Sequence, residues 1–207
     1  MSSEKLRIGV LGSGNGSNCE AILQACERGQ IPGRVVVIVS DIADAFILER
    51  ARKRGIPSQF VGPSRFKTKL EPEFETQMAN ILRDAGVELV ALAGYMRVVK
   101  TPLLTAFAGK MLNVHPSLLP AFPGLHAWEQ ALQAGVRVTG CTVHFVNEGV
   151  DAGPIILQQA VPVLAGDTPA TLHQRIQVEE HTLLPAAIRL FAQNKLQIDG
   201  RQITILE

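Results

Sequence analysis

The sequence predicts an α/β fold built around a parallel sheet, and three observations support this prediction. From residue 6 onward, short runs rich in Val, Ile and Leu alternate with segments of helical period, the pattern of βαβ units. Glycines, which readily adopt the left-handed conformation that ends a helix, follow several of the helical segments. The chain has 207 residues, of which 46% are apolar and 19% charged, enough to bury a full core without disulfides or metals.

The apolar and amphipathic runs give the elements in order along the chain. Strands are expected at Arg7–Leu11, Val35–Ser40, Ser58–Val61, Leu89–Ala93, Met111–His115, Thr139–Val146 and Ile155–Pro162. Helices are expected near residues 17–28, 44–54, 72–85, 101–107, 126–134 and 168–194. Two β-prone arms around Asp199-Gly200 predict a final hairpin that closes one edge of the sheet. No repeat or linker divides the sequence, so a single domain over residues 1–207 is expected.

Charge and cysteine usage limit the classes of partner and compartment. The net charge is +1, from 20 Lys and Arg against 19 Asp and Glu, so no global field attracts nucleic acid or an anionic membrane. Cys19, Cys26 and Cys141 have neither C-x-x-C spacing nor an even count, which favours a reducing compartment. The first apolar run is too short for a signal peptide or a membrane span. We therefore expect a cytoplasmic protein with small-molecule partners, while the sequence makes no prediction of oligomeric state.

The first candidate site is the glycine-rich stretch GSGNGSN at residues 12–18, between the first strand and the first helix. Backbone N–H groups at a helix start bind anions, and Ser17 or Asn18 can both cap the helix and contact a phosphate. A dinucleotide loop with Asp41 on the ribose fits less well, because Ser17 or Cys19 occupies the position of the third glycine. A sugar phosphate is the favoured ligand, with a dinucleotide loop and a tight turn without ligand as the alternatives.

The second candidate site combines Asn113, His115 and Asp151. Side chains alternate along a strand, so Asn113 and His115 project from one face at the end of the fifth strand, where parallel sheets commonly bind ligands. Asp151 belongs to a glycine-bracketed acidic loop and can fix the tautomer of an imidazole and favour its charged form. The alternatives are a structural histidine at 115 and an Asx turn at 151.

The remaining reactive side chains carry weaker signals. His126, His144, His173 and His181 have core or surface roles by default, and no His or Cys pair has metal-ligand spacing, so no metal is expected. Cys141 lacks an identifiable base and is not expected to act as a nucleophile.

Four strings together resemble the glycinamide ribonucleotide formyltransferase family: GSGNGSN (12–18), AGYMR (93–97), NVHPSLLPAFPG (113–124) and GCTVHFVNEGVDAGPIILQ (140–158). The resemblance runs nearly end to end. It implies a doubly wound, mostly parallel sheet with helices on both faces, a Rossmann-like formyltransferase fold.

The resemblance also implies roles for individual positions. The implied catalytic residues are Asn113, His115 and Asp151. Those implied to bind the ribonucleotide, chiefly its phosphate, are Gly16, Ser17, Asn18 and Glu180. Those implied to bind folate are Lys69, Met96, Arg97, Val98, Val99 and Asn113, with the 145–151 region also lining the pterin pocket. Lys69 stands where some relatives have arginine, beside an insertion around Glu71-Pro72.

The implied activity is transfer of a formyl group from 10-formyltetrahydrofolate, a co-substrate, to the amine of 5-phosphoribosylglycinamide in de novo purine (IMP) biosynthesis. Asn113 and a protonated His115 would stabilise the oxyanion, and Asp151 would orient His115. The string N-x-H-P-S-L-L-P also occurs in formyltetrahydrofolate hydrolases and tRNA-directed formyltransferases, which usually have an additional domain for which 207 residues leave no room. A non-catalytic folate or sugar-phosphate binding protein is a further alternative, and an NAD-dependent oxidoreductase is a more distant one.

Overall fold

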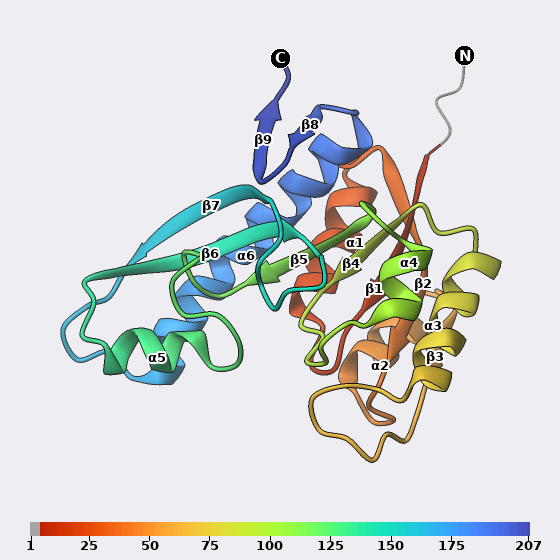
Figure 1. Ribbon diagram of the computed structural model, residues 1–207, viewed down its shortest axis with the longest axis horizontal. Coiled ribbons are helices and arrows are strands. Elements are labelled where there is room, and N and C mark those ends of the chain that lie inside the picture. The colour runs from red at the N-terminus through yellow and green to blue at the C-terminus, as the bar shows by residue number, and fades with distance from the viewer. Residues whose placement is uncertain (1–4) are drawn as a thin grey trace. The chain divides into compact units, whose positions relative to one another are not determined.

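The computed structural model describes residues 5–207, which form two compact units that divide between Leu112 and Asn113 (Figure 1). Hydrogen bonding orders seven strands as β3-β2-β1-β4-β5-β6-β7, and a separate two-stranded sheet contains β8 and β9. β5 (Met111–His115) begins in the first unit and ends in the second.

The first unit is a parallel α/β layer. Its strands are β1 (Leu6–Leu11), β2 (Gly33–Ser40), β3 (Ser58–Phe60) and β4 (Leu89–Leu92). Its helices are α1 (Ser17–Glu27), α2 (Phe46–Lys53), α3 (Pro72–Asp84) and α4 (Thr101–Ala106). β1 pairs in parallel with both β2 and β4, and β2 pairs in parallel with β3. The central strands are apolar along most of their length because both faces of a parallel sheet are covered, and Ile8, Val10, Leu89 and Val90 are fully buried.

The order of the strands makes this unit doubly wound. The chain runs outward from β1 to β2 and β3, then returns to place β4 on the other side of β1. Right-handed crossovers therefore put α1 and α2 on one face of the sheet and α3 on the other. The contacts agree with this arrangement, since α1 packs on α2 and α3 packs on α4. The expected doubly wound sheet with helices on both faces is confirmed.

The second unit packs one long helix on an antiparallel strand pair. Its elements after β5 are α5 (Ala127–Gln133), β6 (Val138–Phe145), β7 (Ile155–Pro162), α6 (Pro169–Ala192), β8 (Leu196–Asp199) and β9 (Gln202–Ile205). α6 lies against β6 and β7, and Thr168 caps it in a capping box with Thr171. Its core contains Cys141, Val161, Leu172 and Ile176. The Trp128 ring packs against this core and stacks on His173, with ring centroids 3.8 Å apart.

The expected helices and strands are all present, with ends within two residues of the prediction. The final hairpin is confirmed, and it lies at an edge of the sheet as expected. β8 and β9 pair only with each other, and β9 lies beside the edge strand β7 without joining its ladder. Among residues 5–207, no helix is both long enough and apolar enough to cross a bilayer.

Candidate functional site

The second unit brings Asn113, His115 and Asp151 together, as the sequence predicted. Asn113 and His115 lie two positions apart on β5 and share a face, while the loop after β6 supplies Asp151. His115 Nδ1 is 3.3 Å from Asp151 Oδ2, and Asn113 Nδ2 donates to Asp151 Oδ1 at 3.4 Å. The carboxylate is therefore shared between the amide and the imidazole.

Backbone geometry fixes Asp151 in this position. Its φ of 50° lies in the left-handed region, which Asp tolerates better than most residues with a side chain. The Gly124 N–H donates to Asp151 Oδ2 at 2.8 Å. Two residues further on, a Cβ at Gly153 would lie 1.7 Å from the Phe145 carbonyl oxygen, so only glycine fits. These constraints explain why an acidic residue and a glycine occur together in this loop.

The electrostatics of the cluster correct one sequence-based expectation. Burial lowers the pKa of His115, and the neighbouring Asp151 carboxylate only partly offsets this effect. The resting imidazole is therefore neutral at neutral pH, not protonated as expected. Burial alone would raise the pKa of Asp151, but the neighbouring His144 and His115 side chains and the Gly124 N–H hold it below its usual value. His115 Nε2 lies 2.8 Å from the Phe122 carbonyl oxygen, so both ring nitrogens face oxygen acceptors.

His144 is the member of this cluster that the sequence analysis missed. It is 2% exposed on β6, and its Nδ1 lies 2.8 Å from the Phe145 carbonyl oxygen, which can only accept. In the neutral ring Nε2 is then the acceptor, and it lies 3.2 Å from Asn113 Nδ2. His144 Nε2 is also 3.6 Å from Asp151 Oδ1. The string TVH could have identified His144 from the sequence. Thr142 and His144 are two polar residues on the same face of a buried strand, with Val143 between them on the other face.

In the first unit, the glycine-rich loop leads directly into α1. Gly16 is the N-cap, with φ 76°, and no side chain caps the helix, so the expectation that Ser17 or Asn18 does so is wrong. A Cβ at Gly16 would lie 2.7 Å from Ile47 Cγ1, so this position accommodates only glycine. Asn18 is buried and Ser17 begins the helix. The arrangement leaves the first backbone N–H groups of α1 without a side-chain cap, as an anion site requires.

A second polar network beside this loop engages Asp41. This buried carboxylate accepts hydrogen bonds from Ser13 Oγ and Arg97 Nε, both at 2.6 Å. Ser13 Oγ also accepts the Met96 N–H at 2.9 Å. Each Asp41 carboxylate oxygen already accepts a hydrogen bond within the unit. Asp41 is therefore not available to bind a ribose, as the dinucleotide interpretation of the loop requires. Asp41 instead connects the glycine-rich loop to the segment 96–97.

The other predicted ligand-binding residues divide between the two units. Arg97 also donates to the Phe66 carbonyl oxygen, Met96 is 55% exposed, and Val99 is buried. Lys69 lies with its ammonium 4.6 Å from the centre of the Phe66 ring and lines a cavity of about 600 Å³ beside α3 and α4. Glu180 is buried in α6 of the second unit. Their contacts with folate or ribonucleotide stay predictions.

Metal ligation has no candidate in the part of the chain that is described. No group of three or more His, Cys, Asp or Glu side chains across residues 5–207 is placed to hold an ion. The cysteines are also poor nucleophiles, because burial raises the pKa of Cys19 and Cys141 to about 12 and that of the half-buried Cys26 to about 11.

Comparison with known proteins shows to which protein family this chain belongs. The model of the formyl transferase family matches residues 6–188, which include every predicted site residue. The chain belongs to the formyl transferase family. This match crosses the boundary between the two units, and one domain over residues 1–207 stays a prediction.

Similar formyl transferases include enzymes of about the same length. The chain is 42% identical over 193 residues to the phosphoribosylglycinamide formyltransferase of Escherichia coli, covering 93% of this chain and 90% of that protein. It is 45% identical over 183 residues to that of Bacillus subtilis, covering 88% and 93%. A crystal structure of glycinamide ribonucleotide transformylase 1 from Symbiobacterium toebii matches with a TM-score of 0.94 and 54% identity, over 100% of both chains.

Other relatives are longer than this chain. It is 44% identical to the human trifunctional purine biosynthetic protein adenosine-3 and covers 94% of its own length but 19% of that protein. The chain thus spans about a fifth of the length of such trifunctional relatives. A formyltetrahydrofolate deformylase from Pseudomonas syringae has a TM-score of 0.91 at 22% identity, which shows a shared fold alone.

Proposed function

We propose that this formyl transferase moves the formyl group of 10-formyltetrahydrofolate to the amine of 5-phosphoribosylglycinamide, a step of de novo purine biosynthesis. The observation that carries the proposal is the cluster of Asn113 and Asp151 around the buried His115 in a chain of this family. The relatives from E. coli and B. subtilis, which bear the name of this activity, cover nearly the same length and support it. We also propose a cytoplasmic location, since the substrates of such a reaction are soluble metabolites.

The neutral His115 suits the first step of this reaction. The free amine attacks the formyl carbon, and the formyl oxygen gains negative charge as the carbon becomes tetrahedral. His115 accepts the proton that the amine loses and returns it to N10 as the C–N10 bond breaks. Asp151 stabilises the imidazolium formed between these events, because its lowered pKa keeps it ionised.

Asn113 is placed to stabilise the oxyanion. Its amide nitrogen is 3.2 Å from His144 Nε2 and 3.4 Å from Asp151 Oδ1. These two acceptors fix the orientation of the amide N–H donors. A developing oxyanion is a stronger acceptor than a neutral imidazole nitrogen, and one such donor contributes roughly 3–4 kcal/mol in other acyl transfers. Gly16, Ser17 and Asn18 would meanwhile hold the phosphate of the ribonucleotide, with Glu180 as a further contact to the nucleotide.

An absorbance assay tests the proposal directly. Purified protein is mixed with a 10-formyl folate, with and without glycinamide ribonucleotide, and release of the deformylated folate is followed. Release that requires the ribonucleotide is the expected result, and His115→Ala should abolish it. The matched control is His126→Ala, because the His126 side chain is 62% exposed and contacts Glu129 and Trp128 rather than the cluster.

The alternative functions give different results in the same assay. Release without ribonucleotide would replace the proposal with a formyltetrahydrofolate hydrolase. No release by protein that binds folate would leave two candidates. Adding initiator methionyl-tRNA separates them, since only a tRNA-directed formyltransferase would then release folate, whereas a non-catalytic binding protein would remain inactive.

A further inference from the structure

A polar network in the first unit connects the two segments that are predicted to bind the two substrates. These are the glycine-rich loop of residues 12–18, which follows β1, and the segment 96–99, which follows β4. β1 and β4 pair in parallel, so both segments leave the sheet at the same edge. A Cβ at Gly12 would lie 3.0 Å from the Ala93 carbonyl oxygen, so the loop and the end of β4 approach each other closely.

Ser13 is the residue through which the loop holds the other segment. Its backbone N–H donates to the Gly94 carbonyl oxygen at 3.0 Å. Its Oγ accepts the Met96 N–H at 2.9 Å and donates its own proton to Asp41 Oδ1 at 2.6 Å. A hydroxyl that donates to a carboxylate is a better acceptor, so these two bonds strengthen each other. A displacement of Ser13 would therefore also displace the backbone at Met96.

Asp41 extends this connection to Arg97. Its side chain is 1% exposed; Oδ1 faces Ser13, while Oδ2 accepts a hydrogen bond from Arg97 Nε at 2.6 Å. The ion pair also affects the loop electrostatically, because an unpaired buried carboxylate would repel a phosphate. Pairing with the guanidinium removes this net charge, so the loop can receive an anion while Asp41 holds its serine.

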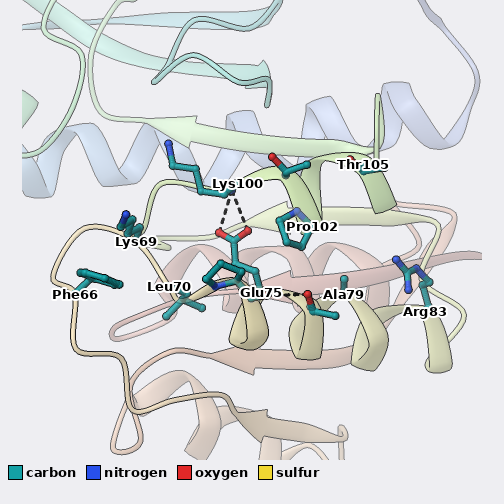
Figure 2. Close-up of a pocket in the computed structure, with 12 residues that line it drawn as sticks. Phe66, Lys69, Leu70, Glu75, Ala79, Arg83, Lys100, Pro102 and Thr105 are labelled. Atoms are coloured by element: carbon teal, nitrogen blue, oxygen red, sulfur yellow. Dashed lines mark hydrogen bonds between the residues drawn. The ribbon is translucent and has the colours of Figure 1, made fainter.

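From Arg97 the network continues to the loop that contains Lys69. The Arg97 guanidinium donates to the Phe66 carbonyl oxygen, and the Val98 N–H donates to the Thr68 carbonyl oxygen at 2.8 Å. Figure 2 shows Phe66 and Lys69 on this loop, which precedes α3. The residues implied to bind folate thus lie at one end of the network, and those implied to bind the phosphate lie at the other.

We propose that Ser13 and Asp41 are positioning residues that couple the binding of the two substrates. The inference rests on the proposed function, in which the loop binds the phosphate of the ribonucleotide and the segment 96–99 binds folate. A phosphate that fixes the loop also fixes Ser13, and through it the Met96 N–H and Asp41. Folate then binds to a segment that is already ordered, so it loses less conformational entropy. The coupling is reciprocal, because each ligand raises the affinity for the other by the same factor.

Binding measurements without turnover test the coupling. Titration calorimetry gives the Kd of tetrahydrofolate on the full chain, without and with saturating ribose 5-phosphate. This sugar phosphate lacks the glycinamide group that meets the folate, so a change in Kd arises in the protein rather than from contact between the ligands. We expect tetrahydrofolate to bind about fivefold more tightly in its presence. The ratio of the two Kd values is the readout, because a merely destabilised chain would weaken both measurements alike.

Two variants interrupt the network at different points. Ser13→Ala removes both bonds of the hydroxyl but leaves the ion pair of Asp41 and Arg97 intact, so the chain should fold and the ratio should fall to about one. Asp41→Asn keeps an acceptor for Ser13 but loses the charge that holds Arg97, and it should lower the ratio as well.

The matched control is Ser40→Ala. Ser40 is buried and directly precedes Asp41, but its hydroxyl accepts the Ile42 N–H at 3.1 Å instead of joining the network. This variant removes a hydroxyl of the same kind from the same region and should keep the ratio of the unmodified chain.

Hydrogen exchange follows the coupling at a single amide. Ribose 5-phosphate alone should slow exchange of the Met96 N–H in the unmodified chain, because that N–H is bonded to Ser13. It should have no effect on this amide in Ser13→Ala.

Three results would overturn the proposal. The first is an equal Kd of tetrahydrofolate with and without ribose 5-phosphate in the unmodified chain. The second is a ratio that survives in Ser13→Ala or in Asp41→Asn, which would mean that the ligands are coupled by another route. The third is an equal loss of the ratio in Ser40→Ala, which would indicate a general disturbance at the end of β2.

The outcome is independent of the formyl acceptor. A chain that shows the coupling but transfers no formyl group to the ribonucleotide would retain these positioning residues and lose the proposed function. A chain that transfers the formyl group but binds the two ligands independently would retain the function and lose the coupling.

Discussion

His115 is subject to two opposing effects at the scale of a single residue. Burial disfavours the charged imidazole, whereas the carboxylate 3.3 Å away favours it, and the net result is a lowered pKa. Such a group is a base at rest and a stabilised cation after it accepts a proton. The pair of His115 and Asp151 is thus suited to shuttling a proton rather than to supplying a permanent positive charge.

Replacing Asp151 with Asn should separate catalysis from structure. Asn tolerates the left-handed φ of 50° and keeps an acceptor for the Gly124 N–H, so the fold should be retained. It removes the charge that stabilises the imidazolium, and we expect kcat to fall about 100-fold or more with KM nearly unchanged. Steady-state kinetics and urea denaturation together check this. Normal kcat with a large loss of folding stability would identify a structural turn instead.

The titration of His115 provides a second residue-scale prediction. NMR titration of its ring should give a pKa below 6.5, and Asp151→Asn should lower that pKa further, because the contribution that raises it is lost. The folded protein then binds this proton less readily than the unfolded chain, so the contribution of His115 to stability decreases as pH falls below about 6.5. A pKa above about 7 would mean that the resting imidazole is protonated at neutral pH and would contradict its proposed role as the base.

The start of α1 gives a prediction at the scale of an element. Gly16→Ala imposes a left-handed φ on alanine and places its Cβ against Ile47, so we expect a loss of about 2–4 kcal/mol in the free energy of unfolding. Gly29→Ala is the matched control, because Gly29 has φ 70° but open space where a Cβ would lie, and should cost only about 1 kcal/mol. Urea denaturation measures both. Equal losses would show that Ile47 moves aside.

The same substitution should weaken phosphate binding. A shift of the N-cap displaces the first N–H groups of α1, so Gly16→Ala should raise the KM for glycinamide ribonucleotide more than the KM for folate. The control Gly29→Ala follows the other end of the helix and should change neither. A larger effect on the folate KM would contradict the assignment of this loop to the phosphate.

The helices and strands were predictable from the sequence, but some side-chain contacts between them were not. Continuous apolar runs such as Leu89–Leu92 and the long period of Pro169–Ala192 identify strands and helices locally. The partner of a side chain on a distant segment gave no comparable local signal, even where a string such as TVH marked the residue itself. His144 reaches Asn113 from 31 residues away, and Asp41 meets Arg97 across 56 residues. The final hairpin was visible in the sequence, whereas its failure to join β7 depends on tertiary packing.

Glu75 affects stability at the scale of the whole molecule. Burial raises its pKa from 4.5 to about 7, so the folded chain keeps a proton that the unfolded chain has lost between these values. Stability contributed by this group is therefore present below about pH 4.5 and decreases as pH rises to about 7. Glu75→Gln keeps an acceptor for the Lys100 N–H but does not titrate.

Urea denaturation at several pH values tests this role of Glu75. The decrease in unfolding free energy between pH 5 and pH 8 should be smaller in Glu75→Gln than in the unmodified chain, by about 1–3 kcal/mol. Identical pH profiles would mean that Glu75 is already ionised at pH 5.

The stacking of Trp128 on His173 has a practical consequence for optical spectroscopy. Trp128 is the only tryptophan of the sequence and lies in the second unit, while the only tyrosine, Tyr95, is buried in the first. Tryptophan emission excited at long wavelength thus follows one half of the chain, and tyrosine absorbance follows the other. Coincident melting curves would establish one cooperative domain, and separated curves would reveal that the halves lose their structure independently.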